Sequence, residues 1–302
     1  MIRPAPLVKG QTIGIATPAS KADESFVLKA CAVIESWGFQ VALAKHWLTA
    51  DSVYLSATDE QRLEDLQQML DNPDIQAIFC ARGGYGTTRI VDRLAFGKFI
   101  KHPKWVTGFS DITALHLKLY ALGVESIHGS MPVQFHKPEY ADSIESLRKL
   151  IIGEAPAPFD VEGFSFNRQG NGTGRMIGGN LSLLADSLGT STSPDTEGKI
   201  LIVEEVGEPL YKIDRMLMQL KRAGKLSHLA GLVMGHFSDL RQEKAPFDES
   251  LQAIVLGKVR EFPYPVAFGF PIGHEAPNLA WRHASTATLS VTPTQALLTF
   301  EQ

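Results

Sequence analysis

The feature that most constrains the fold is the alternation of short β-type runs with helical segments through the first half of the chain. Thr12–Ala16 and Trp105–Phe109 are apolar runs with the length and composition of buried strands. Apolar residues recur at helical spacing over residues 26–37, and Thr58 with Gln61 forms a capping box before a second helical stripe. Strands and helices that alternate at this spacing predict βαβ units and a largely parallel sheet.

A change of composition divides the chain. Between residues 153 and 173, Gly, Pro and Asn crowd together and periodicity is lost, which is typical of a linker. New strands and helices follow, and residues 286–300 resemble a terminal hairpin. We therefore predict a two-lobed α/β protein. Residues 1–152 form an N-terminal domain with a mostly parallel sheet and flanking helices, residues 153–173 a linker, and residues 174–302 a smaller C-terminal α/β domain.

The charge balance excludes two classes of partner. The 302 residues include 29 Lys and Arg and 33 Asp and Glu, which gives a net charge of −4. A mildly acidic chain lacks the basic footprint of a nucleic-acid-binding protein and is not attracted to anionic membranes. No apolar run approaches the roughly 18–20 residues of a membrane span, and the N-terminus shows no signal peptide. We expect a cytoplasmic protein.

The cysteines and histidines predict no metal site. Cys31 and Cys80 stand outside any CxxC motif, and no Cys/His run has zinc-finger spacing. Two free thiols suit a reducing compartment.

A serine on a strand-to-helix turn is the first candidate for chemistry. Ser110 follows the apolar run that ends at Phe109 and precedes a helical segment, as in a nucleophile elbow, although the usual second glycine is absent. The alternative is that Ser110 only caps the helix. The backbone N–H of Asp111 is placed to stabilise an oxyanion. Its side chain is expected to add only local N-terminal stabilisation, about 0.3–1 kcal/mol.

A glycine-rich turn is the second candidate. Residues 82–86 read Arg-Gly-Gly-Tyr-Gly between a predicted strand and the next helix. Such a turn presents backbone N–H groups to an anion, but it lacks the order of a P-loop or a dinucleotide site. A tight turn that needs positive φ angles is an equal alternative.

The third candidate is split between two strand ends. Glu204 and Glu205 end one apolar strand, and His274 with Glu275 follows another. Side chains outside the carboxyl ends of strands build the sites of α/β proteins, although a lone loop histidine is often structural. Because neighbouring strand residues point to opposite faces, Glu204 and Glu205 should not both reach one imidazole.

Taken together, these motifs resemble the LD-carboxypeptidase family of serine peptidases, which includes microcin C immunity peptidases. The resemblance covers nearly the whole chain. It rests on residues 82–86, 108–113, 128–129, 178–181, 204–209, 213–215 and 273–274, and on Asn278.

The resemblance implies a catalytic triad of Ser110, Glu204 and His274, with the nucleophile in one domain and its partners in the other. It also implies a cleft between the lobes and an oxyanion hole built from the backbone of Asp111, Gly83 and Gly84. Family members work without metal or cofactor, commonly as cytoplasmic homodimers. The implied reaction removes a terminal D-alanine from an L-centre of cell-wall tetrapeptides during peptidoglycan recycling.

The chain departs from the family pattern after Asn278. Many members carry Pro-x-Gly there, whereas residues 281–283 read Trp-Arg-His. This change makes His283 a rival to His274 as the base and leaves the effect on specificity open. The terminal carboxylate of a substrate needs a fork of donors. The candidates for it are Arg82, Arg215 and Arg282, and the alternative for any one of them is a structural salt bridge.

Two other functions stay open. A peptidyl-nucleotide amide hydrolase of the microcin C type needs an aromatic platform for the base. Residues 153–175 offer Phe159, Phe164 and Phe166 but no Trp or Tyr, so a muropeptide substrate is preferred. The alternative from a different functional class is a two-lobed binding protein without catalysis, which holds an anion or another ligand on the glycine turn.

Overall fold

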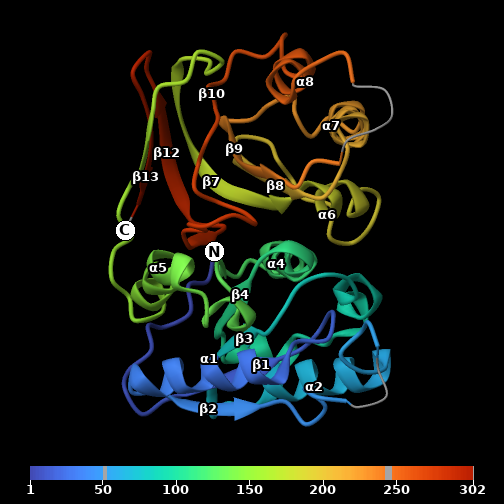
Figure 1. Cartoon of the computed structure of the whole chain (residues 1–302), viewed down its shortest axis with the longest axis vertical. Coiled ribbons are helices and arrows are strands. Elements are labelled where there is room, and N and C mark those ends of the chain that lie inside the picture. Colours follow the sequence, from blue (N-terminus) through green and yellow to red (C-terminus); the bar gives the residue numbers. More distant parts are fainter. Residues whose placement is uncertain (50–52, 242–246, 302) are drawn as a thin grey trace. The chain divides into compact units, whose positions relative to one another are not determined.

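The computed structural model describes residues 1–49, 53–241 and 247–301 and divides into two compact units (Figure 1). Unit 1 contains Met1–Pro156 and Pro277–Arg282. Unit 2 contains Ala157–Ala276 and His283–Gln302. The helices in the described part of the chain include none that is both long and apolar enough to cross a membrane.

Unit 1 is built on a sheet with the predicted parallel pairing. In the described residues its order is β11-β5-β4-β3-β1-β2, and the pairs from β5 to β2 are all parallel. The strands of this sheet are β1 (Thr12–Ala16), β2 (Gln40–Leu43), β3 (Ile75–Cys80), β4 (Trp105–Gly108), β5 (Ser126–His128) and β11 (Trp281–His283). The last residue of β11, His283, is counted with unit 2.

The strands of unit 1 are apolar on both faces because each face has its own core. Trp105 and Val106 are neighbours on β4, and they lie in different buried apolar clusters. This alternation is what a parallel sheet covered by helices on both faces requires. The helices are α1 (Glu24–Ser36), α2 (Asp59–Asp71), α3 (Gly97–Lys101), α4 (Thr113–Ala121) and α5 (Ala141–Ile151). The expected capping box of Thr58 and Gln61 begins α2.

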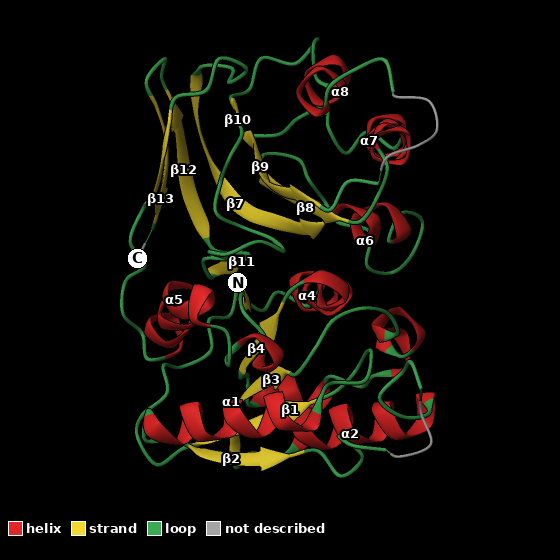
Figure 2. Cartoon of the chain, viewed as in Figure 1, coloured by secondary structure: helices red, strands yellow, loops and turns green. Residues whose placement is uncertain are grey.

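Unit 2 contains a mixed sheet, drawn in Figure 2. In the described residues its order is β10-β9-β8-β7-β12-β13-β6, with parallel pairs from β7 to β10 and antiparallel pairs from β7 to β6. The strands are β6 (Phe159–Glu162), β7 (Gly170–Asn180), β8 (Ile200–Val206), β9 (Gly231–Ser238), β10 (Val266–Ala267), β12 (Thr286–Val291) and β13 (Gln295–Phe300). The helices are α6 (Leu181–Asp186), α7 (Leu210–Arg222) and α8 (Leu251–Lys258).

The span 153–173, which the composition marks as a linker, contains β6 and the first residues of β7. The glycines there serve close approach between backbones. A Cβ on Gly172 would lie 1.8 Å from the carbonyl oxygen of Ala230, so only glycine lets β7 run beside that loop.

A second difference concerns residues 277–282, which leave unit 2 and join unit 1. The backbone N–H groups of Asn278 and Ala280 donate to the hydroxyls of Ser143 and Ser146 on α5, at 2.8 and 2.9 Å. Side-chain acceptors on a distant helix hold this segment, and local sequence carries no signal of such partners.

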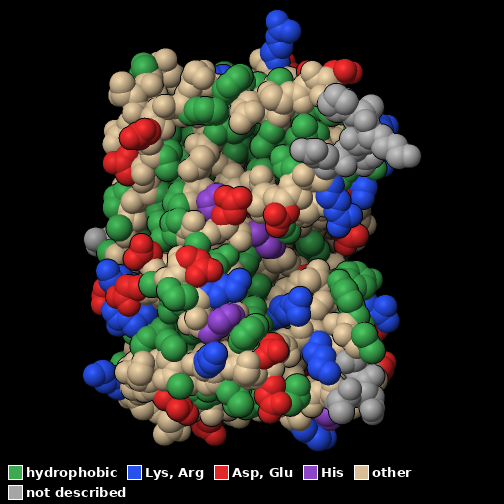
Figure 3. Space-filling view, viewed as in Figure 1, with side chains coloured by type: hydrophobic (Ala, Val, Ile, Leu, Met, Phe, Trp, Pro, Cys, Tyr) green, Lys and Arg blue, Asp and Glu red, His purple; other side chains and the backbone are tan. Residues whose placement is uncertain are grey.

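Charged side chains of both signs are interspersed on the face drawn in Figure 3. This distribution fits the nearly balanced composition, in which acidic residues exceed basic residues by only four.

Candidate active site

Ser110 lies on a strained turn directly after β4. Its φ is 62°, one of the few positive values among described non-glycine residues, and it begins the 3-10 turn Ser110–Ile112 that leads into α4. A left-handed conformation costs a residue with a side chain about 1–2 kcal/mol. Strain of this kind occurs at functional sites, where the surroundings hold the residue in place. The strand, the turn and the helix together display the serine at the carboxyl edge of the sheet.

The glycine turn that follows β3 packs against Ser110. A Cβ on Gly83 would lie 2.9 Å from Cβ of Ser110 and 3.3 Å from the backbone nitrogen of Asp111. Gly84 has φ of 101°, and a Cβ there would lie 2.3 Å from the hydroxyl of Ser20. Both glycines are therefore required by space or backbone angle, and the turn stands beside the candidate nucleophile.

The side chain of Asp111 does more than the local stabilisation that its place in the sequence suggests. It is 1% exposed, and its carboxylate accepts a hydrogen bond of 2.8 Å from the backbone N–H of Thr87. Burial raises the pKa of this carboxyl, while the hydrogen bonds from Thr87 and the charge of Arg62 oppose the rise. Asp111 thus connects the helix start to the end of the glycine turn.

Glu204 and His274 form a close pair in unit 2. Nδ1 of His274 lies 2.7 Å from Oε2 of Glu204, and the glutamate is fully buried near the end of β8. Because a carboxylate only accepts, Nδ1 carries the proton and Nε2 is left as the basic nitrogen. Gly273 packs closely against this pair: its φ is 129°, and a Cβ there would lie 3.1 Å from Oε2 of Glu204.

The pKa of His274 reflects opposing effects. Burial lowers it, but the charge of Glu204, its hydrogen bond, and the charges of Glu205 and Asp239 together raise the pKa above the ordinary value. Glu204 therefore both orients the imidazole and favours its protonated form.

Glu205 points to other partners. Its carboxylate accepts from Nδ2 of Asn180 at 2.9 Å and from the backbone N–H of Ser182 at 2.8 Å. It also accepts from the hydroxyl of Ser182 at 2.6 Å. Burial raises its pKa, and these hydrogen bonds lower it. Neighbouring residues on β8 thus serve different groups: Glu204 contacts His274, and Glu205 supports the start of α6.

His283, the rival base, is bound into the fold. It is fully buried, and its Nε2 accepts a hydrogen bond of 3.2 Å from the backbone N–H of Gly178. A nitrogen that accepts a hydrogen bond from the backbone has its lone pair engaged and is poorly placed to take a proton from a serine.

The three candidate arginines have different surroundings. Arg82 donates to the backbone carbonyl of Lys21 at 2.7 Å. The guanidinium of Arg215 lies over the ring of Tyr211, 5.3 Å from its centroid. Burial and the nearby charge of Arg3 lower the pKa of Arg282, and attraction to Glu125 opposes them.

Sequence reasoning missed His236, which lies near the end of β9. A Cβ on Gly273 would lie 3.1 Å from Cβ of both His236 and Glu204, so the three residues meet. Burial lowers the pKa of His236. The charges of Glu275 and Glu204 raise this pKa, and the charge of His274 lowers it. The sequence signal that points to His236 is its position as a polar residue near the carboxyl end of an apolar strand.

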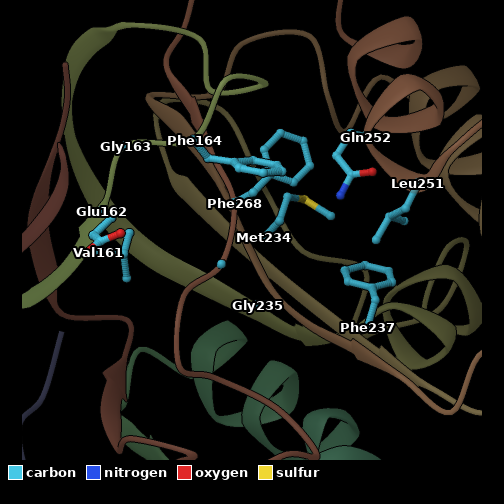
Figure 4. A pocket seen from close by; sticks show the side chains of 11 residues that line it. Val161, Glu162, Gly163, Phe164, Met234, Gly235, Phe237, Leu251, Gln252 and Phe268 are labelled. Carbon is cyan, nitrogen blue, oxygen red and sulfur yellow. The ribbon is translucent and has the colours of Figure 1, made fainter. Parts of the chain in front are cut away.

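A pocket of about 450 Å³ lies in unit 2 (Figure 4). Met234 and Gly235 of β9 line it, immediately before His236. The rings of Phe164 and Phe268 meet edge to face, with centroids 6.2 Å apart. Figure 4 shows both rings on one side of the pocket and Gln252 and Leu251 of α8 on the other.

Among the residues that the structure describes, no group of three or more His, Cys, Asp or Glu side chains is arranged to hold a metal ion. Cys31 and Cys80 are both free thiols, the second fully buried.

Comparisons with known proteins agree with the motifs. Residues 13–129 match the LD-carboxypeptidase N-terminal domain, and residues 173–289 match the LD-carboxypeptidase C-terminal domain. A probable murein peptide carboxypeptidase of Bacillus subtilis is 34% identical and covers 98% of this chain and 94% of its own length.

Two further relatives extend the comparison. The crystal structure of muramoyltetrapeptide carboxypeptidase from Oxalobacter formigenes has a TM-score of 0.84 at 29% identity, covering 95% of this chain and 98% of that one. The microcin C7 self-immunity protein MccF of Escherichia coli is 25% identical over 91% of this chain and 89% of its own. The matches to both domains and the identity along nearly the full length show that this chain belongs to the LD-carboxypeptidase family of serine peptidases.

Proposed function

We propose that this protein is a serine carboxypeptidase that hydrolyses the amide bond between an L-centre and a terminal D-alanine of murein tetrapeptides. Its proposed triad is Ser110, Glu204 and His274. We further propose that it acts in peptidoglycan recycling, in the cytoplasm and as a homodimer, as the family resemblance implies.

The observation that carries the proposal is the hydrogen bond between Glu204 and His274. A buried carboxylate 2.7 Å from Nδ1 leaves Nε2 as the proton acceptor, which is the role of a histidine that activates a serine. Ser110 is the matching nucleophile, because it stands on a strained turn at a strand end beside backbone N–H groups. The names of two relatives, which refer to murein peptide and muramoyltetrapeptide, support the substrate class.

In the proposed mechanism, Oγ of Ser110 attacks the scissile carbonyl carbon while Nε2 of His274 takes the hydroxyl proton. Glu204 stabilises the resulting imidazolium. The negative oxygen of the tetrahedral intermediate is bound by backbone N–H groups of Asp111, Gly83 and Gly84. His274 then gives its proton to the amine of the leaving D-alanine. Water, deprotonated by the same nitrogen, releases the shortened peptide from the serine.

The substrate's terminal carboxylate requires a cationic partner. We propose Arg82, Arg215 and Arg282 as the candidates, to be separated by single glutamine variants. The variant that raises KM for tetrapeptide most, with little change in kcat, identifies the carboxylate-binding residue.

The test is a panel of synthetic tetrapeptides with D- or L-alanine at the end, analysed by mass spectrometry. We expect loss of one alanine from the D-terminated peptides alone. Ser110→Ala should lose on the order of 10⁶-fold in kcat. The matched control is Ser36→Ala, an exposed serine at the end of α1. If Ser110→Ala kept a tenth of the rate, Ser110 would not be the nucleophile.

A second candidate function is hydrolysis of a peptidyl-nucleotide amide. The pocket lined by Phe164, Phe237 and Phe268 favours it, because aromatic rings are suitable partners for a nucleobase. In the same tetrapeptide assay, adenosine monophosphate should compete strongly if this reading is correct. Phe164→Ala should abolish the competition and spare tetrapeptide hydrolysis.

A binding protein without catalysis remains the alternative from another class. A fluorophosphonate probe separates it, since an activated serine becomes covalently labelled. We expect labelling at Ser110, detected by peptide mapping, and none in Ser110→Ala. Unlabelled but folded protein would support the binding function.

A further inference from the structure

One peptide bond of the glycine turn is held by two buried charges of opposite sign. The bond joins Gly86 to Thr87, at the end of the turn that packs against Ser110. Its carbonyl oxygen accepts a hydrogen bond of 2.9 Å from Nη1 of Arg62. Its N–H donates to the carboxylate of Asp111 at 2.8 Å. A cation therefore binds one side of the peptide group and an anion binds the other.

The two side chains are buried to an unusual degree for charged residues. Arg62 and Asp111 are each 1% exposed. Burying a charge is unfavourable unless hydrogen bonds compensate it, so a protein rarely keeps such residues for packing alone. Here much of the compensation comes from the backbone. Nη1 of Arg62 also donates to the carbonyl of Pro18, and Nη2 lies 2.5 Å from Oδ1 of Asp59.

The chain leaves space for the guanidinium at Gly86. A Cβ at this position would lie 2.9 Å from Nη1 of Arg62, and the φ of Gly86 is 132°. Any larger residue would displace the arginine and strain the backbone. Gly86, Arg62 and Asp111 are thus matched to one another across three separate segments of unit 1.

Asp111 is also the residue that follows Ser110. Its backbone nitrogen would lie 3.3 Å from a Cβ on Gly83, so Asp111 lies close to Gly83 at the start of the turn and binds Thr87 at its end. We propose that Arg62 and Asp111 are positioning residues, which hold the turn at residues 83–87 against Ser110 by binding the Gly86–Thr87 peptide from both sides. This inference rests on the proposed function, because the turn supplies backbone donors of the proposed oxyanion hole. Misplacing such donors by about 1 Å can cost a hundredfold in rate.

The activity test compares Arg62→Ala, Arg62→Lys and Asp111→Ala in tetrapeptide hydrolysis. Arg62→Ala and Asp111→Ala should lower kcat by about 100-fold with little change in KM, because the oxyanion is bound only in the transition state. Arg62→Lys keeps the charge and should recover part of the loss. Guanidinium ion at low millimolar concentration should partly rescue Arg62→Ala and leave Ser110→Ala inactive. The matched control is Arg93→Gln, since Arg93 forms an exposed ion pair with Glu60 of α2.

A second measurement does not depend on activity. Hydrogen exchange of the Thr87 amide should be slow in the wild-type protein and at least tenfold faster in Asp111→Ala, at temperatures well below unfolding. If the variants were folded and kept both full kcat and slow exchange at Thr87, the positioning role would be disproved. Faster exchange with unchanged kcat would disprove the catalytic part of the inference and leave the proposed function standing. A wild-type protein that neither hydrolyses tetrapeptide nor labels at Ser110 would remove the proposed function, and the positioning role with it.

Discussion

Nδ1 of His274 donates a hydrogen bond to Oε2 of Glu204, although 70 residues separate them in the chain. The carboxylate is fully buried, whereas the imidazole keeps 20% of its surface exposed. This geometry fits the proposed roles, in which buried Glu204 orients the imidazole and the more accessible His274 exchanges protons.

The two neighbouring glutamates of β8 should differ sharply in their effect on rate. Glu204→Gln should cut kcat by up to about 10⁴-fold, as loss of the orienting carboxylate does in other triads. Glu205→Gln should change kcat little and lower stability by about 1–3 kcal/mol, because Glu205 accepts buried hydrogen bonds from Asn180 and Ser182. Steady-state kinetics and urea unfolding measure the two effects. The reverse order of kcat losses would make Glu205 the acid of the triad.

The pH dependence should identify the base. His274 must be neutral to accept a proton, so kcat/KM should fall as the pH drops through its pKa. That pKa is raised by Glu204 against the effect of burial, which places the acid limb above about pH 6.5, the value for a free histidine. Glu204→Gln should move the limb of the residual activity to lower pH. An acid limb unchanged by this substitution would mean that another group titrates.

Two histidine variants provide the control for this assignment. His274→Ala should lose nearly all activity. His283→Ala should keep its kcat and lose stability, because the N–H of Gly178 would lose its buried acceptor. An inactive but folded His283→Ala protein, together with an active His274→Ala protein, would reverse the choice of base.

The conformation of Ser110 predicts a stability difference between two inactive variants. Glycine adopts a φ of 62° without steric cost, whereas alanine does not. Ser110→Gly should therefore be more stable than Ser110→Ala by about 1 kcal/mol. Thermal unfolding of the two variants measures the difference. Equal stability would indicate that the turn relaxes once the serine is removed.

The buried His116 of α4 should make stability depend on pH. Its Nε2 donates to the carbonyl of Gly108 at 2.9 Å, and its Nδ1 lies 2.8 Å from the hydroxyl of Ser126. Burial lowers its pKa to about 4, against a rise due to Gly108. Below about pH 6.5 the unfolded chain takes up a proton at this histidine before the folded chain does. Stability contributed by neutral His116 is therefore complete above pH 6.5 and is lost as the pH falls toward 4.

The measurement is urea unfolding of wild type and His116→Gln between pH 4 and pH 7. The stability difference between the two proteins should shrink as the pH falls, because glutamine does not titrate. A difference that stayed constant across this range would contradict the lowered pKa.

Local patterns in the sequence determined the fold class of unit 1, the start of α2 and the family of this protein. Alternating apolar runs predicted the parallel sheet of unit 1, and the Thr58 capping box placed the start of α2 where the structure has it. These features depend on neighbours within a few residues, such as backbone hydrogen bonds and side-chain periodicity. The order of the family motifs identified the family, which the comparisons of both domains confirm.

Only the tertiary structure decided which groups meet. The sequence pattern of residues 170–174 is typical of a linker. In the folded sheet, the carbonyl of Ala230 lies so close to Gly172 that only glycine fits there. In the sequence, Arg62 is an ordinary residue of a predicted helix. The structure shows that its guanidinium donates to the carbonyl oxygen of Gly86. Asp111 is predicted as an acidic residue in the first turn of a helix. The structure adds that its carboxylate accepts a hydrogen bond from the backbone N–H of Thr87. Each of these contacts joins segments that are distant in sequence, and a local pattern carries no information about a partner that folding alone brings within hydrogen-bond distance.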